Sequence, residues 1–188
     1  MHSTGGFWLV LGALLLAASL RLLFWAAVAA AVHELGHGLA IRALGGRVAS
    51  LRLTGVGAVM RPRRARLFSY WEECLVALAG PGASFLLALG AAGWGRQFGS
   101  GDAYLLAGVS LAFGVFNLLP LGPLDGGRVL RALASRWAGP DAGERLCGGL
   151  TRALALALAA LGLWVLGTGG NFTLLLCAAW LLWRKEGA

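Results

Sequence analysis

The chain has 188 residues, of which 59% are hydrophobic and 13% charged, and its mean hydropathy is +0.76. This apolar share excludes an ordinary soluble domain and predicts an integral membrane protein. The net charge of +8 does not indicate nucleic-acid binding, because the arginines fall between apolar helices, where a positive-inside bias and anionic lipid account for them. We expect one domain over residues 1–188, without a removable signal peptide or an appended soluble domain.

The first apolar run covers residues 7–44 and is too long for a single membrane crossing. One helix of this length would extend about 57 Å, whereas the hydrocarbon core of a bilayer is about 30 Å thick. The run must therefore fold back, and we place the reversal near Ser19 to Arg21. This predicts a first span over 7–20 and a second over 22–44, ended by Gly45 and Gly46.

The second span contains the motif His33-Glu34-Leu35-Gly36-His37. At helical pitch the two histidines lie about 6 Å apart along the axis and on one face, so both can bind one tetrahedral zinc ion. Glu34 lies beside that face, where its carboxylate can take a proton from water at the metal. The pattern H-E-x-x-H is typical of metalloproteases. The alternative is a neutral histidine pair hydrogen-bonded within a core, which is less favoured because ionisable residues in a membrane segment are costly.

Apolar and polar residues alternate loosely between Gly46 and Tyr70, which predicts a short membrane-associated β-hairpin with a turn near Gly55 and Gly57. A basic cluster, residues 61–66, follows. Its arginines suit anchoring at the inner membrane face, and capture of an acidic substrate tail is the less favoured alternative.

The third predicted span, residues 71–94, begins with Glu72 and Glu73. Paired glutamates followed by arginine one turn later would indicate a glutamate-based intramembrane protease, but position 77 is alanine. Acidic residues at an amphipathic helix start, where they suit the helix dipole, explain the pair better. Small residues from Ala79 to Ser84 favour close helix approach, and Pro81 is expected to leave a carbonyl available toward the site.

A fourth span, residues 103–119, ends in a segment with two prolines three residues apart, Pro120 and Pro123. A regular helix cannot hold both, and unwound chain at membrane depth is tolerated only where it is buried or lines a wet cavity. Asp125 follows this break and is the predicted third metal ligand, which leaves one position for water. The alternative role for Asp125 is the N-cap of a helix over 126–137.

Residues 128–152 are basic and expected at the inner face, and spans over 153–166 and 172–183 follow. The fold class is then an all-α bundle of six transmembrane helices with the short hairpin after the second. Six spans place both termini on one side, with fourteen basic residues inside and Arg21 and Arg96 outside, which predicts a multi-pass protein of the cell membrane with cytoplasmic termini. The three cysteines, Cys74, Cys147 and Cys177, share no close spacing and are expected to be unpaired thiols.

These motifs resemble those of the site-2 protease family of intramembrane zinc metalloproteases, most closely its branch of stage IV sporulation FB-type proteins. The resemblance covers nearly the whole chain: HELGH at 33–37, GVGAV at 55–59, AGP at 79–81 and NLLPLGPLDGG at 117–127. It implies that His33, His37 and Asp125 hold one zinc ion, with Glu34 as the base. It also implies that Asn117 helps to bind the substrate backbone, and that the hairpin at Gly55, Val56 and Gly57 adds an edge strand to an unwound substrate.

The expected function is zinc-dependent cleavage of a peptide bond within or near the transmembrane segment of a membrane-anchored protein. The lipid bilayer and a regulatory membrane protein are the other candidate partners. Two alternatives are open. A zinc-binding scaffold or transporter is disfavoured by the single cluster of polar ligands, and an inactive relative by the intact ligands and base. Ser84 stands where site-2 proteases often have a larger polar residue, and we expect the chain to lack the nucleotide-sensing or PDZ-type domain through which many relatives select or regulate substrates. The sequence therefore leaves the substrate and its regulation undefined.

Overall fold

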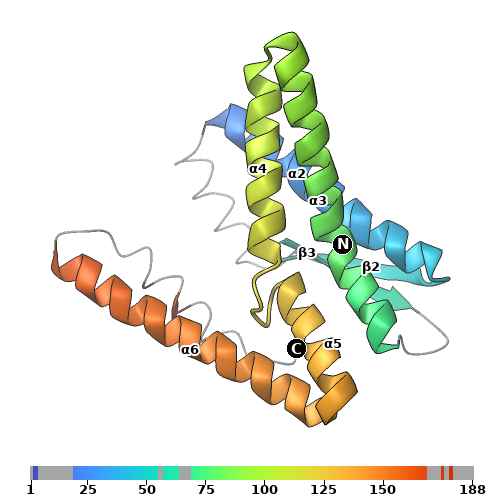
Figure 1. Cartoon of the computed structure of the whole chain (residues 1–188), viewed down its shortest axis with the longest axis vertical. Coiled ribbons are helices and arrows are strands. Elements are labelled where there is room, and N and C mark those ends of the chain that lie inside the picture. Colours follow the sequence, from blue (N-terminus) through green and yellow to red (C-terminus); the bar gives the residue numbers. More distant parts are fainter. Residues whose placement is uncertain are drawn as a thin grey trace. The chain divides into compact units, whose positions relative to one another are not determined.

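The computed structural model describes residues 2–3, 19–54, 57–63, 69–168, 175 and 178–179, with the strands described by their backbone. Contacts divide the chain into two compact units, Met1–Leu118 and Leu119–Ala188, which we take in turn. Among the described residues, the first unit contains the helices α2, α3 and α4 and a small sheet, and the second contains the helices α5 and α6 (Figure 1).

Helix α2, Leu20–Ala43, carries the H-E-x-x-H motif. It begins at the predicted reversal, because the Ser19 hydroxyl oxygen caps it by accepting a hydrogen bond from the Leu22 N–H at 3.3 Å. It ends just before Gly45, whose φ of +73° lies in the left-handed region that glycine adopts without strain. Both predicted ends of this helix are therefore confirmed to within two residues.

Helix α3, Tyr70–Phe98, is the longest helix described in the first unit and begins with a capping box. The Glu72 N–H donates to the Ser69 hydroxyl at 3.3 Å, and the Ser69 N–H donates to the Glu72 carboxylate at 2.8 Å. These bonds satisfy two donors that a helix start otherwise leaves unpaired. Glu72 is therefore part of a helix start, as predicted.

Helix α4, Gly101–Asn117, runs back along α3 (Figure 1). Glycines permit close contacts among α2, α3 and α4. A Cβ at Gly114 of α4 would lie 2.9 Å from the Phe85 ring, and a Cβ at Gly36 of α2 would lie 2.8 Å from the Ala83 side chain and closer still to the Ala79 carbonyl oxygen. The prediction that the segment from Ala79 to Ser84 allows close helix approach is confirmed.

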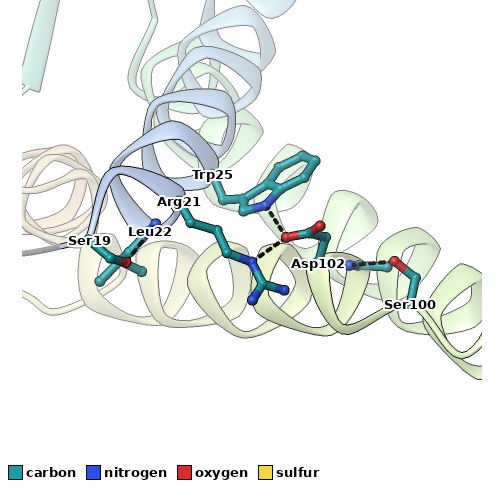
Figure 2. A network of polar contacts seen from close by, with 7 residues as sticks. Ser19, Arg21, Leu22, Trp25, Ser100 and Asp102 are labelled. Carbon is teal, nitrogen blue, oxygen red and sulfur yellow. Dashed lines mark hydrogen bonds and ion pairs between the residues drawn. The ribbon is translucent and has the colours of Figure 1, made fainter.

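A polar network connects the beginning of α2 to the beginning of α4 (Figure 2). The Asp102 carboxylate accepts hydrogen bonds from the Trp25 indole N–H at 2.9 Å and from Nε of Arg21 at 2.5 Å. The bond from Trp25, followed by that from Arg21, lowers the pKa of the exposed Asp102 carboxyl below its ordinary value.

The sheet lies after α2 in the chain. Strands β2, Arg47–Thr54, and β3, Gly57–Arg63, pair antiparallel with an irregularity between Val48 and Ser50, and the short strand β1, His2–Ser3, pairs parallel with β2. The backbone thus contains the hairpin predicted for this segment. Its turn residues Gly55 and Val56 lie outside the described residues.

The described part of the second unit contains a helical hairpin formed by α5, Asp125–Ala138, and α6, Pro140–Gly167 (Figure 1). Gly139, with a φ of +88°, makes the turn, and Pro140 stands at the start of α6, where its missing N–H costs no hydrogen bond. A Cβ at Gly143 of α6 would lie 2.6 Å from the Arg131 carbonyl oxygen of α5, so the two helices approach closely there.

The prediction of an all-α bundle with six membrane spans is wrong. Within the described residues, three helices are long and apolar enough to cross a membrane, Leu20–Ala43, Tyr70–Phe98 and Asp141–Gly167, while α4 is apolar but shorter. Three strands accompany these helices. Nearly all of the predicted first and last spans, 7–20 and 172–183, lies outside the described residues.

The later helices also have other boundaries than predicted. The sequence analysis separated a basic segment, 128–152, from a short span, 153–166, whereas α6 is continuous from Pro140 to Gly167. The charged residues Glu144 and Arg145 lie on its exposed surface and do not interrupt it. Helix α4 ends at Asn117 instead of residue 119, because the chain already turns before Pro120.

Candidate metal centre

The two motif histidines converge inside the first unit. His33 is 2% exposed and His37 is 6% exposed. Their Nε2 atoms lie 3.2 Å apart, and the rings meet edge to face with centroids 4.8 Å apart. The predicted placement of both imidazoles on one face of the helix is confirmed.

Helix α3 holds the His37 ring from behind. Nδ1 of His37 lies 2.7 Å from the Val76 carbonyl oxygen. A carbonyl only accepts, so Nδ1 carries the proton and the Nε2 lone pair faces His33. Pro81 removes the donor that the Ala77 carbonyl would receive in a regular helix, but the carbonyl that binds His37 is the preceding one, of Val76.

Ser84, also on α3, holds the His33 ring. Its hydroxyl oxygen lies 3.0 Å from Nδ1 of His33, and Ser84 is fully buried at 0% exposure. The Phe113 ring of α4 packs edge to face against His33 with a centroid separation of 5.0 Å. Contacts from two neighbouring helices therefore orient this imidazole so that its Nε2 points toward His37.

Gly80 brings the α3 backbone directly beside both Nε2 atoms. A Cβ at this position would lie 2.8 Å from Nε2 of His33 and closer still to Nε2 of His37. No side chain fits there without displacing a ring. The sequence analysis attributed the small residues of this segment to helix packing alone and missed this role. The AGP sequence at 79–81 was the available signal.

The histidine pair suits a tetrahedral zinc ion. Zinc–nitrogen bonds of about 2.0–2.1 Å at the tetrahedral angle place two ligand nitrogens about 3.3–3.4 Å apart. The observed separation of 3.2 Å is close to that value. A buried backbone carbonyl and a hydroxyl behind the rings are the usual outer partners that orient metal-binding histidines. Donor type, separation and surroundings thus agree with zinc.

Asp125, the predicted third ligand, belongs to the second unit. It is the first residue of α5 and is 7% exposed. The cap position is held by Leu124, which makes no side-chain cap bond, so the alternative role of Asp125 as the N-cap does not match this helix start. Nη1 of Arg128 donates to its carboxylate at 3.3 Å. All three proposed ligand residues are buried.

The other predicted site residues are placed as follows. Glu34 follows His33 on α2 and is half-buried. Asn117 is the last residue of α4, and its Nδ2 donates to the Phe113 carbonyl at 2.9 Å. Gly57 begins β3, while Gly55 and Val56 lie outside the described residues. The catalytic and substrate-binding roles of these residues stay predictions.

An H-E-x-x-H helix whose imidazoles converge among apolar helices is characteristic of membrane-embedded metallopeptidases. The chain matches peptidase family M50 over residues 22–99 and 102–161 and belongs to that family. Together with the three long apolar helices, this membership assigns the chain to a membrane.

Similar proteins agree with this assignment. The chain is 33% identical over 177 residues to a putative zinc metalloprotease of Synechocystis sp., covering 89% of this chain and 45% of that protein. It is 29% identical over 152 residues to a zinc metalloprotease of Methanocaldococcus jannaschii, covering 75% of this chain and 44% of that protein. The chain thus spans somewhat less than half the length of these curated relatives.

The solved structure of a site-2 protease from Methanocaldococcus jannaschii is similar to the fold, with a TM-score of 0.73 and 26% sequence identity, covering 95% of this chain and 85% of that one. The resemblance to site-2 proteases is confirmed. The narrower assignment to the sporulation branch stays a prediction, since none of these similarities distinguishes it.

Proposed function

We propose that this protein is a zinc-dependent intramembrane endopeptidase that cleaves a peptide bond within or near the transmembrane segment of a membrane-anchored protein. The observation that carries the proposal is the buried pair of Nε2 atoms 3.2 Å apart on an apolar helix. Membership of a peptidase family and the names of the relatives, which are zinc metalloproteases, support it.

In this proposal His33, His37 and Asp125 hold one zinc ion. Bound there, the ion would polarise the scissile carbonyl and acidify a water molecule. The buried carboxylate of Asp125 contributes the negative charge that the two neutral imidazoles lack. Arg128 offsets part of that charge and orients one carboxylate oxygen through its 3.3 Å hydrogen bond.

Glu34 is the proposed general base. It takes a proton from the attacking water and delivers it to the leaving amine. A transmembrane substrate must unwind locally first, because the carbonyls of a helix are already hydrogen-bonded. Asn117 and the edge of the hairpin at Gly55, Val56 and Gly57 would bind the unwound backbone.

We further propose a multi-pass arrangement in the cell membrane with both termini cytoplasmic. The distribution of arginines supports this orientation, because Arg42 near the end of α2 and the basic residues of β2 and β3 follow the motif, while Arg21 precedes it. Water would then reach the metal from the cytoplasmic side, and the bilayer and a regulatory membrane protein would be the further partners.

The test is cleavage by purified Glu34→Gln protein, assayed in proteoliposomes against a panel of tagged single-span proteins. General acid–base catalysis contributes about 10²- to 10⁴-fold, so cleavage should fall at least about 100-fold. Bound zinc, measured by elemental analysis, should stay near one per chain because the ligands are unchanged.

The matched control is Glu73→Gln, which alters an exposed carboxylate of α3 and should cleave like wild type. Retained cleavage by Glu34→Gln would refute the role of the base. Zinc flux into liposomes that survives Glu34→Gln, with no cleavage by the wild type, would favour the transporter alternative.

A further inference from the structure

The turn before α5, residues 119–124, receives a hydrogen-bond acceptor from one hydroxyl group of α6. Thr151 is 5% exposed, and its Oγ1 accepts a hydrogen bond from the Gly122 N–H at 3.0 Å. The same hydroxyl donates to the Cys147 carbonyl oxygen at 2.8 Å. Its single proton is therefore used within α6, and its oxygen is oriented as an acceptor toward the turn.

Two backbone hydrogen bonds shape the turn from within, from the Leu121 N–H to the Leu119 carbonyl at 2.8 Å and from the Leu124 N–H to the Leu121 carbonyl at 2.9 Å. Pro120 and Pro123 have no backbone N–H to donate. Leu124, at the cap position of α5, makes no side-chain cap bond, so the beginning of this helix lacks the usual local anchor. The bond from Gly122 to Thr151 supplies an anchor from a residue 29 positions away.

A second set of contacts holds the other side of the turn. A Cβ at Gly127 would lie 2.9 Å from the Gly122 nitrogen and would overlap the Leu121 carbonyl. The Cys147 thiol, one helical turn before Thr151, donates to the Gly127 carbonyl at 3.6 Å. The turn, the first residues of α5 and this face of α6 therefore pack as one block, and Asp125 lies between Gly122 and Gly127 in the chain.

We propose that Thr151 is a positioning residue for the metal centre: by binding the Gly122 N–H it fixes the turn that sets the direction of the Asp125 carboxylate. This inference rests on the proposed role of Asp125 as a zinc ligand. Outer partners of metal ligands typically change metal affinity by about 10- to 100-fold when they are removed. Thr151 acts one step further out, through the backbone, so we expect a loss near the lower end of that range.

The test compares full-length Thr151→Val, which keeps the shape of the side chain and loses the hydroxyl, with wild type in detergent micelles. The zinc dissociation constant, measured by competition with a chromogenic chelator, should rise about 10-fold. Hydrogen exchange of the zinc-free protein should be faster over residues 119–127, because the Gly122 N–H has lost its acceptor. Thr151→Ser keeps the hydroxyl and should restore both properties.

The matched control is Thr168→Val at the end of the same helix, where the hydroxyl donates to the Val165 carbonyl at 2.9 Å. It should leave zinc affinity and exchange over residues 119–127 at wild-type values. If Thr151→Val does not give a cooperative thermal transition, Thr151→Ala provides a second variant without the hydroxyl. Wild-type zinc affinity in a folded hydroxyl-free variant, or equal losses in Thr151→Val and Thr151→Ser, would overturn the proposal.

Asp125→Ala separates this inference from the function on which it rests. Wild-type zinc affinity in Asp125→Ala would refute the ligand role of Asp125 and, with it, the role of Thr151 toward the metal. Loss of zinc in Asp125→Ala together with wild-type affinity in Thr151→Val would refute the role of Thr151 alone.

Discussion

At the scale of single residues, Gly80 controls the space around the two imidazoles. Gly80→Ala should weaken zinc binding at least about 10-fold, because the new methyl group would occupy the position that the two Nε2 atoms require. The measurement is zinc content per purified chain after dialysis against a graded series of chelator concentrations.

Gly82→Ala is the matched control, since a Cβ there has nothing within 4 Å, and both glycines adjoin Pro81. The Gly82→Ala protein should keep its zinc, and alanine should favour the helix over glycine. Equal zinc retention in the two variants would show that the α3 backbone does not lie against the histidine nitrogens.

The sequence predicted the two histidines of α2 that are proposed to bind zinc, but not the groups that orient their rings. His33 and His37 could be paired because helical pitch alone sets their relation. Their partners behind the rings, Ser84 and Val76, lie 51 and 39 positions away. One of these partners is a backbone carbonyl, which has no residue signature. Such contacts depend on how α2 and α3 pack, and no local pattern encodes that.

At the scale of elements, Gly36 permits a close contact between α2 and α3. Gly36→Ala should push these helices apart, because its methyl group would meet the Ala83 side chain and the Ala79 carbonyl. Overpacking of this kind typically costs about 1–3 kcal/mol, which should lower the thermal midpoint in micelles.

Gly90→Ala on α3 serves for comparison, because a Cβ there has nothing within 4 Å. Its midpoint should equal or exceed that of wild type, since alanine favours a helix by up to about 1 kcal/mol over glycine. A Gly36→Ala protein as stable as Gly90→Ala would contradict the close crossing.

Element boundaries could be predicted where a residue forces them and not elsewhere. Gly45 ended α2 and the prolines at 120 and 123 ended α4 within two residues of the predicted positions, because each excludes a regular helix. The start of α6 was missed because residues 128–152 were interpreted as a basic segment at the inner membrane face, while a helix can carry charges on an exposed face.

At the scale of the whole molecule, the network of Arg21, Trp25 and Asp102 makes the free energy of unfolding depend on pH in the acidic range. The pKa of Asp102 is lowered in the folded protein, so the ionised carboxylate favours folding. Its contribution is present above the ordinary value of 3.8 and is lost as the pH falls through the lower folded-state value. The thermal midpoint of Asp102→Asn should therefore lie below that of wild type at neutral pH, and the gap should close in acid.

Circular dichroism melts in micelles between about pH 2 and pH 7 measure this gap. Trp25→Phe keeps an aromatic ring and removes the indole donor. In this background the difference in thermal midpoint caused by Asp102→Asn should be smaller, because the Trp25 hydrogen bond is the largest cause of the lowered pKa. Parallel profiles for wild type and Asp102→Asn over the whole range would exclude the network as a source of acid sensitivity.

The anchoring of both imidazoles has a thermodynamic consequence. Val76 and Ser84 hold the rings in place in the folded protein, so little side-chain entropy is left to lose when a metal ion binds. Immobilising a side chain on binding costs about 0.5–1.5 kcal/mol, so two rings fixed in advance improve affinity by roughly one to two powers of ten. Removal of a bound ion should accordingly leave a site that binds a new ion without rearrangement of the two rings.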